Sequence, residues 1–142
     1  MDNDAKRNSE LVLRYLDGCN QGDREVLLAV LAPDVVHYFL PPQFKTIRGA
    51  PALIDHWLRY REAFRPVWNV DQLIVQGERA ATEWSCLWTP RGRQRALMSR
   101  GAEWYLIRDG AIVEIRAYFF ADNMLDSELP EFPYAERGYL TR

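Results

Sequence analysis

The spacing of apolar residues changes at Pro66, and this change constrains the fold more than any other feature of the sequence. Before Pro66, apolar side chains recur at the spacing of amphipathic helices. After Pro66, they alternate with polar side chains, which is the period of β-strands. Helices followed by strands are typical of α+β folds, in which helices cover one face of an antiparallel sheet.

Three helices are predicted, and all of them precede Pro66. The first covers residues ~5–20. Asp23 is a suitable N-cap for the second, which Pro33 and Asp34 end. Pro51 begins the third. The apolar faces of the first and third helices comprise Leu11, Tyr15, Leu16 and Cys19, and Leu53, Ile54, Trp57, Tyr60 and Phe64.

One short strand is predicted between the second and third helices, over residues 35–40, and a loop follows it to Gly49. Four further strands should form an antiparallel meander. Turn residues separate them, including a strong hairpin turn at residues 108–110. Gly101 is the expected site of a β-bulge. The four strands are predicted at 67–75, 80–89, 96–107 and 111–120.

The composition limits what the chain can do. Its 142 residues suffice for one domain, and 48% apolar content argues against disorder. A net charge of −2 gives no case for binding nucleic acid or an anionic membrane. The polar N-terminus is not typical of a signal peptide, and no apolar run reaches the ~20 residues of a membrane span. Cys19 and Cys86 lack metal-ligand spacing, so we expect a cytoplasmic protein with reduced thiols and neither metal nor cofactor.

Alternation along the strands divides the side chains into two faces. The more apolar faces should point toward the helices, and they comprise Thr82, Trp84, Cys86 and Trp88, then Val113, Ile115, Ala117 and Phe119. His37 and Phe39 share one face of the early strand. For residues 96–107, alternation leaves open whether Glu103 and Tyr105 or Arg100 and Trp104 face inward.

The outward faces combine aromatic and charged side chains. Such a surface favours a subunit interface, with an ordinary half-exposed sheet as the alternative. We therefore expect a homodimer. The outward residues are Arg100, Trp104, Leu106, Glu114, Arg116, Tyr118 and Phe120.

Three stretches, LVLRYLDGCNQGDREVLLAVLAPDVV, RGAPALIDHW and RGAEWYLIRDGAIVEIRAYF, resemble the nuclear transport factor 2-like (NTF2-like) superfamily. The similarity is greatest to the branch that holds ketosteroid isomerase and the SnoaL-like polyketide cyclases. It implies one domain over residues 1–122, a cone in which three helices pack on a curved, mostly antiparallel sheet around an apolar cavity. The tail, residues 123–142, is not covered by the resemblance. It is either frayed, laid across the cavity mouth or in contact with a partner subunit.

The resemblance also implies site residues. Tyr15 falls on the family's oxyanion-hole tyrosine, and Glu103 falls where the isomerase has a protonated aspartic acid, which points Glu103 inward. Phe39 stands where the isomerase keeps its catalytic aspartate, so His37 is the nearest ionisable group. Asp122 follows the last strand, where SnoaL-like cyclases carry a base, although a turn role is the alternative.

Physical chemistry also makes Glu103 a candidate catalytic residue. Burial raises the pKa of a carboxylic acid, so that the group can stay protonated and donate a hydrogen bond near neutral pH. The candidate catalytic residues are therefore Tyr15, His37, Glu103 and Asp122. His56 is expected to be exposed and Cys86 to be an inert thiol. The expected substrate-binding residues are Phe39, Trp57, Thr82, Trp84, Cys86, Trp88, Tyr105, Ile115, Ala117 and Phe119.

These features favour a cofactor-free enzyme that transfers a proton next to a carbonyl group of a hydrophobic small molecule, by isomerisation, aldol-type cyclisation or dehydration. Two other functions remain open. The same pocket suits an epoxide hydrolase or other water-adding enzyme, and it also suits a non-catalytic binding module.

Overall fold

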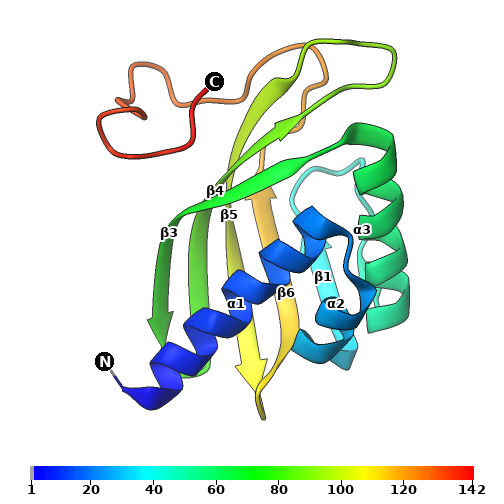
Figure 1. Cartoon of the computed structure of the whole chain (residues 1–142), viewed down its shortest axis with the longest axis vertical. Helices are drawn as coiled ribbons and strands as arrows, with labels where there is room; N and C mark the ends of the chain where they lie inside the picture. Colours follow the sequence, from blue (N-terminus) through cyan, green and yellow to red (C-terminus); the bar gives the residue numbers. More distant parts are fainter. Residues whose placement is uncertain (1) are drawn as a thin grey trace.

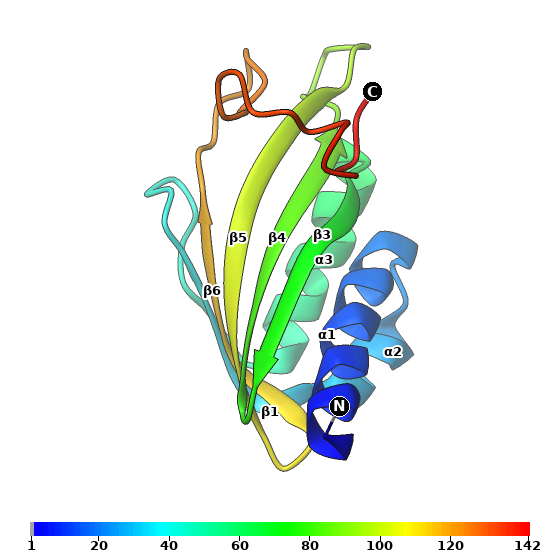
Figure 2. The same cartoon turned by 90° about the vertical axis from the view of Figure 1, so that its left-hand side faces the viewer.

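Three helices lie on one face of a curved six-stranded sheet that does not close into a barrel (Figures 1 and 2). The computed structural model describes residues 2–142, so Met1 lies outside the described residues. The predicted α+β class is confirmed. The elements are α1 (Asn3–Gln21), α2 (Arg24–Val30), β1 (Leu31–Phe39), β2 (Ile47–Arg48), α3 (Ala50–Phe64), β3 (Val67–Gln76), β4 (Arg79–Trp88), β5 (Leu97–Arg108) and β6 (Ala111–Phe119).

The strand order is β2-β1-β6-β5-β4-β3. β3 to β6 form the predicted antiparallel meander. β1 runs parallel to β6, and its register places His37 opposite Ile115 and Phe39 opposite Ala117. This pairing brings residues from the first third of the chain beside the end of the meander.

Local sequence signals set the helix ends. Gly22 adopts the left-handed conformation that ends α1, and the Asp23 carboxylate accepts a hydrogen bond from the Val26 N–H at 3.2 Å, as expected of an N-cap. Pro51 lies in the first turn of α3. None of the helices within residues 2–142 is both long and apolar enough to cross a membrane.

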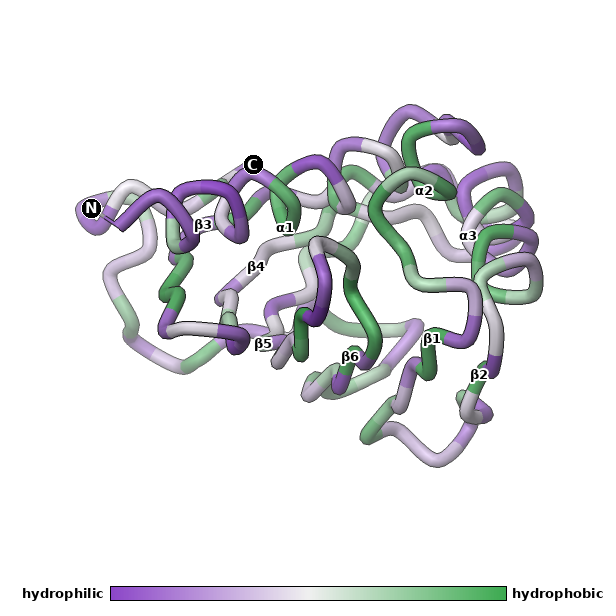
Figure 3. Tube along the Cα trace, turned by 90° about the horizontal axis from the view of Figure 1, so that it is seen from below, coloured by the Kyte–Doolittle hydropathy of each residue, from purple (hydrophilic) through white to green (hydrophobic). Residues whose placement is uncertain are grey.

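The core lies between the helices and the concave sheet face. Hydrophilic segments gather on the outward sides of the helices (Figure 3). The largest fully buried side chains come from all the layers and include Tyr15, Leu27, Leu53, Ile54, Tyr105, Ile107, Ile112 and Ile115.

The start of β1 differs from the sequence prediction. α2 ends at Val30, and the strand begins at Leu31, before Pro33. The register between β1 and β6 shifts between Leu31 and Val36, so Pro33 occupies an irregular stretch where a missing N–H does little harm. The short strand β2 was not predicted, because two residues carry no periodicity.

The predicted bulge at Gly101 is wrong. Gly101 pairs in regular register with Trp84 on β4 and Phe119 on β6. The irregularity between β5 and β6 lies after Leu106 instead, and it places Ile112 in the core. Val113, which alternation assigned to the core, is only half-buried for the same reason.

The tail crosses the sheet on the face opposite the helices (Figures 1 and 2). The Arg100 guanidinium donates a hydrogen bond to the Leu140 carbonyl at 2.5 Å and lies 3.8 Å from the ring centre of Tyr134. The Tyr139 hydroxyl donates to Glu83 on β4 at 2.7 Å. The tail's aromatic residues therefore lie on the outer sheet face of their own chain and not across the cavity mouth.

The tail leaves part of the outer face open. Trp104 and Tyr118 there are 45% and 44% exposed, and the Arg116 guanidinium lies 6.0 Å from the Trp104 ring centre. Phe120, which alternation assigned to this face, borders the cavity instead, because it follows the last paired residue of β6. A homodimer through the open part stays a prediction.

Candidate active site

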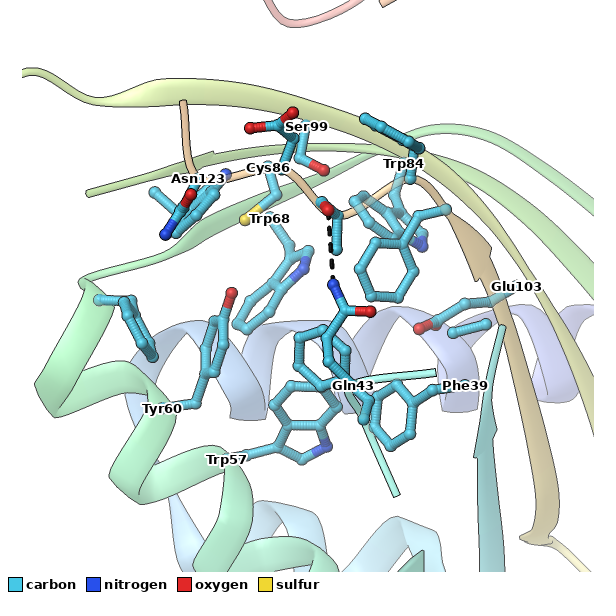
Figure 4. Close-up of a pocket in the computed structure, with 18 of the residues that line it drawn as sticks. Phe39, Gln43, Trp57, Tyr60, Trp68, Trp84, Cys86, Ser99, Glu103 and Asn123 are labelled. Atoms are coloured by element: carbon cyan, nitrogen blue, oxygen red, sulfur yellow. Dashed lines mark hydrogen bonds between the residues drawn. The ribbon is translucent and has the colours of Figure 1, made fainter. Parts of the chain in front are cut away.

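A cavity of about 700 Å³ lies between α3 and the concave face of the sheet. α3 supplies three aromatic side chains, the strands supply most of the rest, and the loop after β1 supplies Gln43 and Phe44 (Figure 4). This volume suits a small-molecule ligand. The wall comprises Phe39, Gln43, Phe44, His56, Trp57, Tyr60, Phe64, Trp68, Trp84, Cys86, Trp88, Ser99, Glu103, Ala117, Phe119, Phe120, Ala121, Asp122 and Asn123.

Gly101 makes room for the Trp84 indole. A Cβ atom at Gly101 would lie 2.5 Å from the nearest ring atom of Trp84 and 2.9 Å from the Phe119 Cβ. These distances are too short for real contacts, so only glycine lets the two aromatic side chains meet over β5. Their ring centres are 5.6 Å apart. The glycine thereby shapes one wall of the cavity.

Glu103 faces the cavity from the middle of β5 and is only 6% exposed (Figure 4). Its Oε2 accepts a hydrogen bond from the Tyr105 hydroxyl. Burial raises the pKa of Glu103 to about 7, although the hydrogen bond from Tyr105 opposes the rise. Near neutral pH the side chain can therefore both give and take a proton.

His37 lies beside Glu103 but behind the cavity wall. Its Nε2 is 3.8 Å from Glu103 Oε1, which is longer than a hydrogen bond. Neither ring nitrogen has a hydrogen-bond partner among residues 2–142, and the ring stacks on Phe39 with centres 4.1 Å apart. Burial lowers the pKa of His37 to about 3, so the imidazole is neutral at pH 7.

Tyr15 is buried in the core and does not line the cavity. Its hydroxyl accepts a hydrogen bond from the Trp57 indole N–H at 2.8 Å. Burial raises the pKa of Tyr15 well above its ordinary value, so the hydroxyl stays protonated. Tyr15 and Glu103 both contact Tyr105, but only Glu103 reaches the cavity surface.

The other predicted site residues divide into two groups. Thr82, Tyr105 and Ile115 are buried behind the wall, with 3.5 Å between the Thr82 and Tyr105 hydroxyl oxygens. Those that line the cavity, besides Glu103, are Phe39, Trp57, Trp84, Cys86, Trp88, Ala117, Phe119 and Asp122.

Asp122 stands at the cavity mouth, where its Oδ1 accepts a hydrogen bond from the Met124 N–H at 2.7 Å. Such a bond, two residues along the chain, is typical of a turn. Cys86 faces the cavity as a thiol, and burial raises its pKa far above the ordinary value. No cluster of three or more potential metal ligands occurs within residues 2–142.

The expectation that His56 is exposed is wrong. His56 borders the cavity, stacks on Tyr60 with ring centres 6.1 Å apart and contacts Trp57 edge-on. Burial lowers its pKa to about 4, with a further contribution from the Arg59 charge. The cavity keeps α3 away from the sheet, so a wider arc of the helix faces inward than periodicity indicated.

Glu103→Gln should change how stability depends on pH. Between pH 4.5 and about 7, the unfolded chain loses the Glu103 proton while the folded chain keeps it, so rising pH destabilises the native protein. Glutamine does not titrate. The variant should therefore gain about 3 kcal/mol of unfolding free energy relative to the native protein between pH 4 and pH 8.

Urea denaturation of both proteins at the two pH values measures this difference. His37 is present in both, so its own titration cancels. Glu62→Gln, at an exposed position of α3, is the matched control and should show a constant difference. An equal difference for Glu103→Gln at pH 4 and pH 8 would contradict the raised pKa.

The sequence and the fold are both similar to those of known proteins. The model of the SnoaL-like domain matches residues 12–115. No curated protein shows significant sequence similarity to the chain. A protein of unknown function with a cystatin-like fold from Methylobium petroleophilum PM1 is 29% identical, with 97% of this chain and 93% of that chain covered and a TM-score of 0.71.

Two structures of lower identity share the fold. A proposed SnoaL-like polyketide cyclase from Jannaschia sp. CCS1 is 20% identical, with 84% of this chain and 89% of that chain covered and a TM-score of 0.72. A proposed ketosteroid isomerase from Kribbella flavida DSM 17836 is 21% identical, with 91% and 86% covered and a TM-score of 0.70. Solved NTF2-like proteins have the same arrangement of helices and sheet.

Proposed function

The chain belongs to the SnoaL-like domain family, and from this premise we propose that it is an enzyme that transfers a proton next to a carbonyl group of an apolar small molecule. The observation that carries the proposal is Glu103, a buried carboxyl group on the wall of an aromatic cavity with a pKa of about 7. A group with a pKa near the working pH is suited to general acid–base catalysis.

In this mechanism the Glu103 carboxylate takes a proton from the carbon beside the carbonyl, and the electron pair moves to the carbonyl oxygen as an enolate. The protonated Glu103 then returns the proton. Where a C=C bond adjoins the deprotonated carbon, the enolate is a dienolate, and return of the proton to its far carbon gives isomerisation. Attack of the enolate on a second carbonyl gives cyclisation, and the new alkoxide takes the proton from Glu103.

Tyr105 and His37 act as positioning residues in this proposal. The Tyr105 hydroxyl holds Oε2, so Oε1 is the oxygen left for the substrate. The neutral His37 ring packs behind that oxygen without adding a positive charge. A charged neighbour would lower the pKa of Glu103 and weaken it as a base.

Names of similar structures support the class of reaction, since a proposed polyketide cyclase and a proposed ketosteroid isomerase share the fold. At their identities the likeness concerns the fold alone, and the reaction rests on Glu103. The aromatic wall, with Trp57, Trp84 and Trp88, suits a flat, apolar substrate.

Exchange of carbonyl-adjacent protons with D₂O tests the proposal without knowledge of the natural substrate. A panel of cyclic ketones and enones is incubated with the native protein and with Glu103→Gln, and deuterium uptake is followed by NMR. We expect uptake for at least one ketone that binds, with loss of uptake in the variant. Tight ketone binding without exchange would overturn the proposal. In that case, opening of an epoxide probe would indicate a water-adding enzyme, and inertness would indicate a binding module.

A further inference from the structure

The loop between β4 and β5 carries three arginines. Residues 91–95 read RGRQR, and Arg91, Arg93 and Arg95 are all exposed. None of the three pairs with a carboxylate among residues 2–142. The whole chain carries a net charge of −2, so this positive cluster does not follow from a basic composition.

Direct contacts join this loop to the cavity wall. The Arg91 guanidinium lies 5.3 Å from the ring centre of Phe64, and Arg93 donates a hydrogen bond to the Asn123 carbonyl at 3.2 Å. Phe64 and Asn123 both line the cavity. The Thr89 N–H donates to the Phe64 carbonyl at 2.8 Å and ties the loop to the end of α3. Arg91 and Arg93 therefore stand at the rim of the cavity, and Arg95 follows them in the same exposed loop.

The two ends of the cavity differ in charge. Glu103 lies six residues beyond Leu97, the first residue of β5, which is about 20 Å along an extended strand. The aromatic wall lies between Glu103 and the arginine loop. An anionic group beside the Glu103 carboxyl would oppose its ionisation, whereas the same group at the rim would meet unpaired guanidinium groups. Asp122 is the other carboxylate on the wall, and its Oδ1 accepts a hydrogen bond from the Met124 N–H.

We propose that the ligand of this cavity is an amphipathic anion, with an apolar body inside the aromatic walls and a carboxylate, sulfonate or phosphate group at Arg91, Arg93 and Arg95. This inference rests on the proposed function for the placement of the carbonyl at Glu103. The anionic group fixes which end of the substrate enters first, because the reverse orientation would bury the anion beside Glu103.

Two fluorescent probes with one aromatic body test the inference. 1-Pyrenebutyrate carries a carboxylate, and 1-pyrenebutanol carries a neutral hydroxyl at the same place. At low salt we expect the native protein to bind pyrenebutyrate more tightly, on the order of tenfold, and the preference should shrink at high salt. The variant R91Q/R93Q/R95Q should lose the preference and keep its affinity for pyrenebutanol.

R14Q/R79Q/R108Q is the matched control, since it changes net charge equally at exposed positions outside the loop. It should keep the preference. Equal binding of both probes to the native protein, or loss of preference in both variants, would overturn the inference. Weaker pyrenebutanol binding by R91Q/R93Q/R95Q would also overturn it, because the loop would then only shape the cavity.

Failure of both probes to bind would contradict the apolar-body ligand itself. Deuterium exchange with neutral ketones tests the proposed function separately.

Discussion

Glu103→Gln is expected to lower kcat for a carbonyl substrate by ~10²–10⁴-fold, the usual contribution of a general acid–base group. Glutamine keeps the shape of the side chain and its ability to hydrogen-bond Tyr105, but it cannot take up and return a proton. KM should change little, because the aromatic wall supplies most of the substrate contact. Steady-state kinetics on a ketone identified by deuterium exchange measures both constants.

The pH profile gives a second measurement of the same prediction. If the Glu103 carboxylate is the base, kcat/KM should rise through pH 7 and then level off. Tyr105→Phe removes the hydrogen bond that lowers the pKa of Glu103, so its profile should shift to higher pH. Activity of Glu103→Gln close to that of the native protein would contradict the mechanism.

Tyr15→Phe separates this mechanism from the one that the family resemblance implied. The Tyr15 hydroxyl contacts the Trp57 indole and lies away from the cavity surface. Near-normal turnover is therefore expected. A loss as large as that of Glu103→Gln would return Tyr15 to the role of oxyanion donor.

Gly101→Val is expected to destabilise the fold by about 1–3 kcal/mol, as overpacked sites do. The new Cβ would meet the Trp84 ring at 2.5 Å and the Phe119 Cβ at 2.9 Å, and neither group is the flexible end of a side chain. The indole must therefore move or the strands must separate. Urea denaturation measures the stability change, and the affinity for pyrenebutanol reports whether the displaced indole narrows the cavity.

Ala102→Val is the matched control on the neighbouring, outward position of β5. It should change stability by no more than about 0.5 kcal/mol. Replacing Trp84 by Leu in the Gly101→Val background should recover part of the lost stability, because the two positions are directly paired. Full stability of Gly101→Val alone would show that the wall at Trp84 is not tightly packed.

The sequence predicted the layers well because helices and strands have different apolar periods. The N-cap at Asp23 and the order of the meander followed from local signals. The position of the bulge could not be predicted from local signals, because it depends on pairing between β5 and β6 and not on the glycine at position 101. The start of β1 was missed for a similar reason, since its irregular pairing tolerates Pro33.

The predictions for the site also succeeded where the signal was local and failed where it depended on tertiary contacts. Alternation left the direction of Glu103 open, and the family resemblance pointed it inward, where the structure places it. Helical periodicity gave the direction of Tyr15 but not the partner of its hydroxyl, which comes from an indole 42 residues away. His56 and Gln43 were missed, because one depends on the width of the cavity beside α3 and the other lies in a loop without periodicity.

The irregular start of β1 determines which sequence changes this site can accept in evolution. Leu31 and Val36 are five residues apart on β1, but their partners on β6 are only two residues apart. This irregular stretch determines which side chains of the rest of β1 face the cavity. Losing one residue in that stretch would turn Tyr38 toward Glu103 and His37 toward solvent, since a slip of one reverses every side chain of a strand. Replacement of residues at positions 37 and 39 keeps the phase. We therefore expect the side chains that face Glu103 from β1 to be exchangeable by substitution, whereas a deletion in the irregular start of the strand would reverse their direction.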